Sequence, residues 1–328
     1  MILAGDIGGT KTHLALFRKT NGKLTLVRGE IFPSRDYDGL EAVIRKFLPT
    51  KKTAIDGACF GVAGPVLGGR CETTNLPWIV EADLIRRKFR IPIVRLLNDL
   101  EAMAYGTLGL QAHEFLVLNP GKAERTGNRA VIAAGTGLGE AVLFRNGDGH
   151  RASASEGGHT DFGARNPTEI ALLEYLLKRF KHVSYERIIS GPGLLNTFQF
   201  LKDTGRAKVP GWLSEKMAAG DPSAVITEAA RTGRSEICAK TLDLFVSIYG
   251  AEAGNLALKA LATGGVYLGG GIAPHIIPKL SDGTFMKAFV DKGRYASLLR
   301  SIPVRIILNE TVGLLGAARH AFDALSPR

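Results

Sequence analysis

The chain has 328 residues, 45% of them hydrophobic and 22% charged, which is the composition of a globular protein with one large or two medium domains. No apolar run approaches the ~20 residues of a membrane span, and the chain starts in a strand rather than in a basic, apolar, cleavable leader. The three cysteines, Cys59, Cys71 and Cys238, are too few and too scattered for a disulfide framework or a cysteine-based zinc site, so we expect a protein of the reducing cytoplasm.

The formal net charge of +11 raises the question of a nucleic-acid partner. The densest basic patches, Arg86–Lys88 with Arg90 and Lys178–Arg179 with Lys181, lie in segments with the periodicity of amphipathic helices. No helix-turn-helix signature, zinc finger or RNP motif is present. We interpret the patches as solvated helix faces and predict neither a nucleic-acid nor a membrane partner.

Residues 2–17 predict a β-hairpin with a glycine-rich turn. Ile2–Ala4 is a short apolar run, and Leu14 and Leu16 recur at the period of a strand. A P-loop or a dinucleotide-binding loop leads into a helix after its glycines, and this turn does not. Backbone N–H groups in such a turn can still form an anion nest, and glycine lets a phosphate approach closely. The alternative is a plain hairpin with a Gly-Gly turn.

The side chains of this turn suit a nucleotide. Asp6 ends the first strand, where its carboxylate can hold Mg²⁺ through water. Thr10 adds a hydroxyl group and Lys11 a positive charge. Two interpretations of Lys11 stay open, a contact to phosphate or a solvent-facing start of the second strand. The candidate nucleotide-binding residues are Gly5, Asp6, Ile7, Gly8, Gly9, Thr10 and Lys11.

The next segments predict helices over 39–48 and 81–89, strands over 54–62 and 91–97, and a loop over 73–78. Asn98 follows the last strand and is a good N-cap for a helix over 99–108. Asp99 is then either a ligand-binding carboxylate at the carboxyl end of a strand or a first-turn acid that opposes the helix dipole. The break over 106–114 predicts a connection between domains.

Residues 131–144 repeat the first hairpin pattern. An apolar run meets a turn that contains Gly135, Thr136 and Gly137, and an alternating run over 141–144 follows. Two such hairpins indicate a duplicated chain. Residues 153–162 then predict a polar loop with Glu156, His159 and Asp161, whose Gly-Gly pair rules out a helical HExxH metal site. Such a loop suits a hydroxyl-rich ligand.

The rest of the chain is mostly helical. We expect helices over 167–180, 194–203, 274–280 and 310–325, strands over 266–268 and 302–308, and a loop over 210–222 with room for a short helix. Residues 223–261 predict helix in two pieces, with Gly233 and Gly250 or Gly254 as breaks or close contacts. The strand over 266–268 leads into Gly269, Gly270 and Gly271. Helices that alternate with strands and hairpins indicate an α/β protein.

With these motifs in this order, the chain resembles the bacterial glucokinases, from the hexokinase-like branch of the actin-like ATPase superfamily. The resemblance runs from Ile2 to about His320. The related ROK sugar kinases share the first hairpin but carry a cysteine-rich zinc motif that this chain lacks. The motifs of the resemblance are Gly5-Asp-Ile-Gly-Gly-Thr10, Thr74-Asn-Leu-Pro-Trp78, Leu97-Asn-Asp99, Gly135-Thr-Gly137, Ser155-Glu-Gly-Gly-His159, Glu186-Arg-Ile-Ile-Ser-Gly-Pro-Gly193 and Leu268-Gly-Gly-Gly271.

The resemblance implies a two-domain actin-like ATPase, ribonuclease H-like α/β fold, with duplicated β-hairpin phosphate loops and a central interdomain cleft. A small domain would comprise residues 1–109 and about 310–328, and a large domain residues 110–309. The implied nucleotide is ATP with Mg²⁺, held at the two hairpins and with its base near Gly269–Gly271. We also expect a homodimer in the cytoplasm.

The implied reaction is phosphorylation of D-glucose to glucose 6-phosphate, the entry step of glycolysis. Asp99 would accept the proton of the 6-hydroxyl group or orient it, because phosphoryl transfer depends mainly on positioning and charge neutralisation. A kinase for another hexose or an amino sugar, or a non-catalytic sugar-sensing regulator, stays open. The implied sugar-binding residues are Asn98, Asp99, Glu156, His159 and Glu186.

Overall fold

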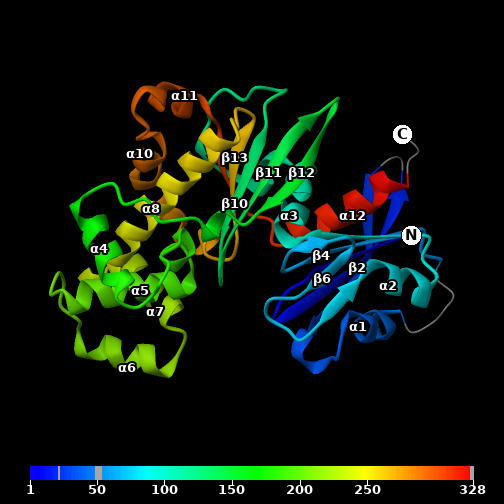
Figure 1. Ribbon diagram of the computed structural model, residues 1–328, viewed down its shortest axis with the longest axis horizontal. Helices are drawn as coiled ribbons and strands as arrows, with labels where there is room; N and C mark the ends of the chain where they lie inside the picture. Colours follow the sequence, from blue (N-terminus) through cyan, green and yellow to red (C-terminus); the bar gives the residue numbers. More distant parts are fainter. Residues whose placement is uncertain (21–22, 49–53, 326–328) are drawn as a thin grey trace. The chain divides into compact units, whose positions relative to one another are not determined.

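Figure 1 shows a computed structural model of the chain, which describes residues 1–20, 23–48 and 54–325. The chain forms two compact units. Unit 1 comprises Met1–Glu114, Arg151–Ala154 and Asn309–Arg328, and unit 2 comprises Phe115–His150 and Ser155–Leu308. The sequence pattern does not separate residues 151–154 from their neighbours. Residues 326–328, which we assigned to the small domain, lie outside the described residues.

Unit 1 is built on a five-stranded sheet. Strand β1 pairs antiparallel with β2 and parallel with β4, and β4 pairs parallel with β8, so the first predicted hairpin is confirmed. Strand β3 was not predicted, because most side chains of this edge strand are exposed and give no apolar pattern. The strands, in spatial order, are β3 (Lys23–Pro33), β2 (Lys11–Thr20), β1 (Ile2–Ile7), β4 (Gly57–Val62) and β8 (Ile93–Asn98).

Helices cover both faces of this sheet (Figure 1). Ile2 and Ala4 of β1 pack with Leu314 on the face of α3 (Asp99–Thr107) and α12 (Val312–Ala324). Leu3, which points the other way, packs on the face of α1 (Leu40–Phe47) and α2 (Ala82–Phe89). Glycine lets α3 and α12 approach closely, since a Cβ at Gly316 would overlap the carbonyl oxygen of Ala102.

A small antiparallel sheet completes the strands of unit 1. It consists of β5 (Val66–Leu67), β6 (Arg70–Glu72) and β7 (Ile79–Glu81), none of which was predicted because each is so short. Gly68 and Gly69 connect β5 to β6 with φ of +59° and +78°, values that suit a tight hairpin turn. The loop expected over 73–78 lies between β6 and β7.

Unit 2 contains a six-stranded sheet that repeats the topology of unit 1. Strand β10 pairs antiparallel with β11 and parallel with β13, which pairs parallel with β14, as β1 does with β2, β4 and β8. The order β12-β11-β10-β13-β14 therefore matches β3-β2-β1-β4-β8, and the predicted duplication is confirmed. The strands are β12 (Gly149–Ser155), β11 (Leu138–Asn146), β10 (Arg129–Ala134), β13 (Gly265–Gly269), β14 (Val304–Ile307) and β9 (Phe115–Asn119).

Two strands of this sheet were not predicted. Strand β9 has no fully buried side chain, and β12 buries only Ala152, so neither shows an apolar alternation. The loop expected over 153–162 was wrong at its start, because Ser153–Ser155 belong to β12. Its Gly157–His159 part forms a 3-10 turn.

The helices of unit 2 gather around α8 (Glu236–Lys259), which packs against α5, α7 and α10. Gly233, with φ of +65°, separates α7 from α8 as predicted. Gly250 and Gly254 are close contacts rather than breaks, because a Cβ at either would meet a carbonyl oxygen of α10. The short helix expected within 210–222 is α6, whereas α10 and α11 were not predicted. The remaining helices are α4 (Pro167–Leu177), α5 (Gly191–Asp203), α6 (Gly211–Ala219), α7 (Pro222–Arg231), α9 (Ile277–Leu280), α10 (Thr284–Val290) and α11 (Ala296–Ser301).

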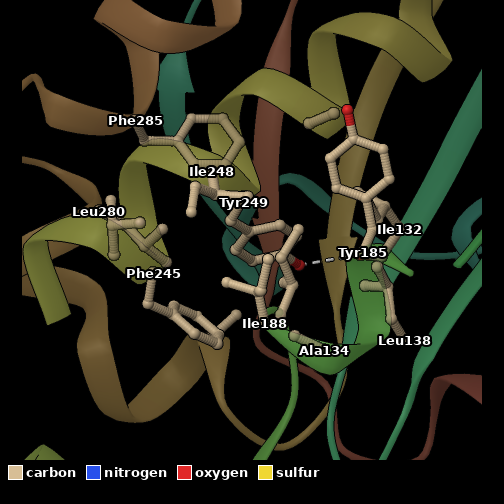
Figure 2. Packing of buried hydrophobic residues seen from close by; sticks show 14 of the residues in the cluster. Ile132, Ala134, Leu138, Tyr185, Ile188, Phe245, Ile248, Tyr249, Leu280 and Phe285 are labelled. Atoms are coloured by element: carbon tan, nitrogen blue, oxygen red, sulfur yellow. Dashed lines mark hydrogen bonds between the residues drawn. The ribbon is translucent and has the colours of Figure 1, made fainter. Parts of the chain in front are cut away.

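The core of unit 2 lies between α8 and the sheet (Figure 2). Tyr249 is fully buried there among Phe245, Phe285 and Ile248. Its hydroxyl group donates a hydrogen bond of 3.1 Å to the carbonyl oxygen of Ile132, which satisfies the buried phenol and ties α8 to β10. Within the described ranges, no helix is long and apolar enough to cross a membrane.

Candidate active site

The predicted residues of unit 1 lie at one edge of its sheet. The parallel pairing aligns Ile7 of β1 with Val62 of β4, and Val62 with Asn98 of β8. The carboxyl ends of these strands therefore meet, which brings Asp6, the turn after β1 and Asn98 to the edge where α/β sheets bind ligands. Gly5 and Ile7 differ from the others because they are buried, and a Cβ at Gly5 would come within 2.6 Å of the Phe60 ring.

Buried hydroxyl groups support the glycine turn of unit 1. The Ser34 hydroxyl donates to the Gly8 carbonyl oxygen at 2.8 Å and lies 2.9 Å from the Thr12 hydroxyl. The Gly8 N–H donates to the Lys11 carbonyl oxygen at 3.0 Å, which closes the turn. Thr10 and Lys11 are exposed. No sequence pattern marks Ser34, which begins a 3-10 turn directly after β3, and neither this turn nor the strand was predicted.

Asp6 is a partly buried carboxylate without an opposite charge beside it in the described part of unit 1. Burial raises the pKa of the Asp6 carboxyl group above its ordinary value. A Cβ at Gly313 would lie 3.3 Å from Asp6 Oδ2, so the carboxylate lies against the first turn of α12. A cation would stabilise the ionised form of such a group.

The residues present fit Mg²⁺ rather than a cation held by protein ligands alone. No cluster of three or more His, Cys, Asp or Glu side chains that suits a metal occurs among the residues that the structure describes. Mg²⁺ usually keeps several waters and takes one or two carboxylates together with substrate phosphates. A single carboxylate such as Asp6 meets that requirement.

Asn98 and Asp99 form the junction between β8 and α3. The Asn98 Oδ1 accepts a hydrogen bond of 2.9 Å from the Leu100 N–H, and the Asn98 N–H donates to Glu101 Oε2 at 3.1 Å. This capping box confirms the predicted N-cap and fixes the start of the helix. The Asn98 Nδ2 donates to the Gly64 carbonyl oxygen at 3.2 Å. Asp99 is the first residue of α3 and is partly exposed.

The second glycine turn and the third glycine cluster meet in unit 2. Gly135–Gly137 connects β10 to β11, and Gly270 has φ of +82° with no room for a Cβ against the Ala134 carbonyl oxygen. The Ile272 N–H donates to that same oxygen at 3.2 Å. The structure therefore brings Gly135 beside Gly271, as a common nucleotide site would require.

A cavity of about 820 Å³ opens beside these glycines, entirely within unit 2. Gly135, Thr136 and Gly271 line one side of it. The other walls come from α5 and α7 and include Ser223 and Arg231, which sequence reasoning missed. The Ser223 hydroxyl donates to the Gly191 carbonyl oxygen at 2.8 Å and ties the two helices together at the cavity. The size fits a nucleoside.

The predicted sugar-binding residues of unit 2 lie around Gly137. The Leu138 N–H donates to Glu186 Oε2 at 2.9 Å, and a Cβ at Gly137 would lie 2.5 Å from the same oxygen. The His159 Nε2 lies 4.0 Å from Glu186 Oε1. Glu156 is exposed at the start of the 3-10 turn, and its carbonyl oxygen accepts a hydrogen bond from the His159 N–H. A carboxylate beside an imidazole, with a second, exposed carboxylate in the same turn as the imidazole, suits a polyhydroxylated ligand.

Comparison with known proteins points in one direction. The sequence model of the glucokinase family matches residues 3–324. A glucokinase from Nostoc sp. is 41% identical over 97% of this chain and 98% of its own length. The crystal structure of glucokinase from an Antarctic psychrotroph is 31% identical, with a TM-score of 0.86 over 98% of both chains. A ROK family glucokinase from Streptomyces griseus, solved with glucose and AMPPNP, is 20% identical, with a TM-score of 0.66 over 98% of this chain and 99% of its own.

Proposed function

The chain belongs to the glucokinase family, whose members are enzymes that phosphorylate glucose, and we therefore propose that it transfers the γ-phosphoryl group of ATP to the 6-hydroxyl group of D-glucose. Its fold is that of the actin-like ATPases, as the sequence motifs led us to expect. The observation that carries the proposal is the meeting of three features in unit 2, namely a glycine turn, a nucleoside-sized cavity and the Glu186–His159 pair. The reaction is the entry step of glycolysis.

ATP is the proposed donor, with its base in the cavity beside Gly135 and Gly271. Support comes from the cavity volume of about 820 Å³ and from the glycines at its rim, where a phosphate can approach the backbone N–H groups. Gly8, Gly9 and Thr10 of the first turn, together with Gly137 of the second, are the proposed phosphate contacts. A Cβ at Gly9 would lie 2.5 Å from Asn75 Cβ, so the first turn tolerates no larger residue there.

Asp6 is the proposed partner of Mg²⁺, through water. The bound ion would neutralise charge that develops on the β- and γ-phosphates. The Asp6 carboxylate, which is on β1 and lies against the first turn of α12, would orient the ion's water ligands. Burial raises the pKa of the Asp6 carboxyl group, and a bound cation would stabilise its ionised form, which supports this role.

Asp99 is the proposed residue that orients the 6-hydroxyl group and accepts its proton. Support comes from its place at the start of α3, which the Asn98 capping box holds fixed. The hydroxyl proton can leave late in a loose transition state, so a carboxylate that mainly orients the oxygen is sufficient. Asn98, Glu156, His159 and Glu186 would then recognise the other hydroxyl groups, because a site built to pair a hydroxyl rejects an analogue that lacks it.

A coupled phosphorylation assay with Mg-ATP tests the function. The acceptors are glucose, mannose, fructose, glucosamine and N-acetylglucosamine. Turnover largely confined to glucose supports the proposal as stated. Turnover with another of these sugars would keep the phosphoryl transfer and correct the substrate. A folded protein that binds glucose but phosphorylates none of them would instead be a sugar-sensing regulator.

A further inference from the structure

A buried acid that the proposed reaction does not use lies beneath the sugar-binding turn. Glu140, on β11, is 1% exposed, and no group in the described part of the chain hydrogen-bonds to its Oε1. A buried carboxylate oxygen without a hydrogen-bond partner is unfavourable, so such a group is retained either neutral or for a function. Its position indicates what that function is.

The Glu140 carboxyl group touches the turn that carries Glu156 and His159. A Cβ at Gly157, between these two residues, would overlap Glu140 Oε2. A Cβ at Gly158 would overlap the Leu138 carbonyl oxygen, so both glycines of the turn rest on the start of β11. The Gly157 N–H is held by the Ser155 hydroxyl at 3.0 Å. The turn therefore sits directly on the Glu140 side chain.

A second buried acid, Glu252 on α8, lies close enough to Glu140 for its charge to raise the pKa of Glu140. Glu252 is fully buried, and its carboxylate accepts hydrogen bonds from Asn255 Nδ2 at 2.8 Å and from Lys259 Nζ at 3.4 Å. The same Asn255 Nδ2 donates a hydrogen bond of 3.0 Å to the hydroxyl oxygen of Tyr185, which precedes Glu186 in the chain. Tyr185 and Leu138 lie in the same buried cluster (Figure 2). The two acids thus lie behind both segments that carry sugar-binding residues.

The charges around Glu140 favour its neutral form. Burial, and secondly the charge of Glu252, raise the pKa of Glu140 to about 8, while Lys259 opposes this shift. Tyr249 also lies near Glu140, but burial keeps its pKa far above neutral. Two further charged groups lie near Tyr185 and Glu252. The charge of Arg165 lowers the pKa of Tyr185, and Lys292 interacts with the charge of Glu252.

We propose that Glu140 is a positioning residue for sugar binding: as the neutral acid it supports the Gly157–His159 turn, and its ionisation beside Glu252 displaces that turn and weakens glucose binding. This inference rests on the proposed function. It makes glucose affinity depend on pH through a residue that does not contact the sugar. The nucleotide cavity, which Glu140 does not line, would not share that dependence.

Calorimetric titration of glucose without ATP, from about pH 6 to about pH 9, tests the proposal. The wild-type protein should lose about fivefold or more in affinity toward the alkaline end. Glu140→Gln keeps the shape of the neutral acid and cannot ionise, so its affinity should match that of the wild type near pH 6 and stay flat. If Glu140 had a purely structural role, the glucose affinity of Glu140→Gln would differ from that of the wild type by the same factor at every pH. Binding of an ATP analogue should show no such difference.

A second variant keeps the test decisive if Glu140→Gln does not fold. Lys259 is largely exposed, with 57% of its side chain accessible, so Lys259→Gln should fold. Loss of its charge makes Glu140 harder to ionise, and the midpoint of the affinity loss should move to higher pH. Glu236→Gln, on the exposed face of the same helix, is the control and should leave the profile unchanged.

The outcomes separate the inference from the function on which it rests. Glucose binding that is independent of pH in the wild type, or that depends on pH equally in Glu140→Gln, overturns the inference alone. A midpoint that Lys259→Gln leaves unmoved or moves to lower pH also overturns it. Absence of glucose binding at every pH overturns the proposed function, and the inference with it.

Discussion

Asp99 is an acid in the first turn of α3 and is also the proposed group that acts on the sugar. A substitution can separate these two roles. Asp99→Asn keeps the shape and the helix cap but removes the base. We expect kcat to fall by about 10²–10⁴-fold, with a smaller change in glucose affinity, because general base catalysis contributes on that order. Steady-state kinetics and glucose titration measure the two effects.

The matched control for Asp99 is Asp83→Asn. Asp83 is also an acid in the first turn of a helix, α2, and its side chain is exposed and paired with Arg86 at 3.1 Å. This variant should retain kcat and glucose affinity. Near-normal turnover of Asp99→Asn would reduce Asp99 to a residue that opposes the helix dipole.

The proposed role of Asp6 is on the nucleotide side of the reaction and not on the sugar. Asp6→Asn removes the charge that would hold Mg²⁺ through water, so ATP-dependent turnover should fall at least about 10²-fold. Glucose affinity should stay within about twofold of wild type, and the protein should not be less stable, because burial already disfavours the Asp6 carboxylate. Kinetics over a range of Mg²⁺ concentrations and glucose titration test this. Equal loss of turnover and of glucose binding would make Asp6 structural.

At the scale of elements, the first hairpin depends on a strand that the sequence pattern does not reveal. Ser34 follows β3, is fully buried, and bonds both the Gly8 carbonyl oxygen and the Thr12 hydroxyl. Ser34→Ala leaves these groups unsatisfied, which should lower the unfolding free energy by about 1–3 kcal/mol. The KM for ATP should rise several-fold while glucose affinity is kept.

Ser301→Ala is the control for Ser34, since the Ser301 hydroxyl is exposed and donates within its own helix to Leu298. It should change neither stability nor kinetics. An unchanged KM for ATP in a folded Ser34→Ala protein would mean that the turn keeps its shape without this support.

The contact between α3 and α12 is a second property of elements. A Cβ at Gly316 would overlap the Ala102 carbonyl oxygen, so Gly316→Ala should force the helices apart and lower the unfolding free energy by about 1–3 kcal/mol. Gly211→Ala is the control, because a Cβ at this first residue of α6 meets no atom within 4 Å. That change should be neutral or stabilise by up to about 1 kcal/mol. Denaturant unfolding measures both, and equal stabilities would contradict the prediction.

The elements that the sequence predicts are those with buried faces. The strands β1, β4, β8, β10 and β13 are apolar runs, and α3 carries its own cap at Asn98. Edge strands such as β3, β9 and β12 bury few side chains, so they leave no periodic signal. The short helices α10 and α11 have no side-chain cap at the N-cap position, and each buries apolar side chains, Phe285 and Phe289 in α10 and Leu299 in α11.

The candidate site was predictable where glycine or a helix cap marks it. Gly135–Gly137 and Gly269–Gly271 are visible as motifs, and the structure brings them together. Ser34, Ser223 and Glu140 were not predictable, because single serines and acids carry no pattern and their importance comes only from the groups that they touch. A sequence pattern does not reveal long-range contacts of this kind.

At the scale of the whole molecule, one topology has been used twice with different results. The β1–β2 hairpin places a carboxylate, Asp6, just before its turn, whereas the β10–β11 hairpin has Ala133 at the aligned position. In the proposed reaction, unit 1 supplies Asp6 and Asp99, and unit 2 supplies a cavity and the Glu186–His159 pair. The two units share one topology, and different side chains at aligned positions give each unit a different part in the proposed chemistry.

The stability of the molecule should depend on pH through Glu140. Its pKa is raised from 4.5 to about 8 in the folded protein, so between these values the folded state holds a proton that the unfolded chain has released. The unfolding free energy contributed by this group therefore falls as pH rises through that window, by at most about 1.4 kcal/mol per pH unit. The side chain of Glu140→Gln does not ionise, so the unfolding free energy of this variant relative to wild type should rise steadily from about pH 5 to about pH 8. Urea unfolding of both proteins at matched pH measures the difference, and parallel pH profiles would show that Glu140 ionises normally despite its burial.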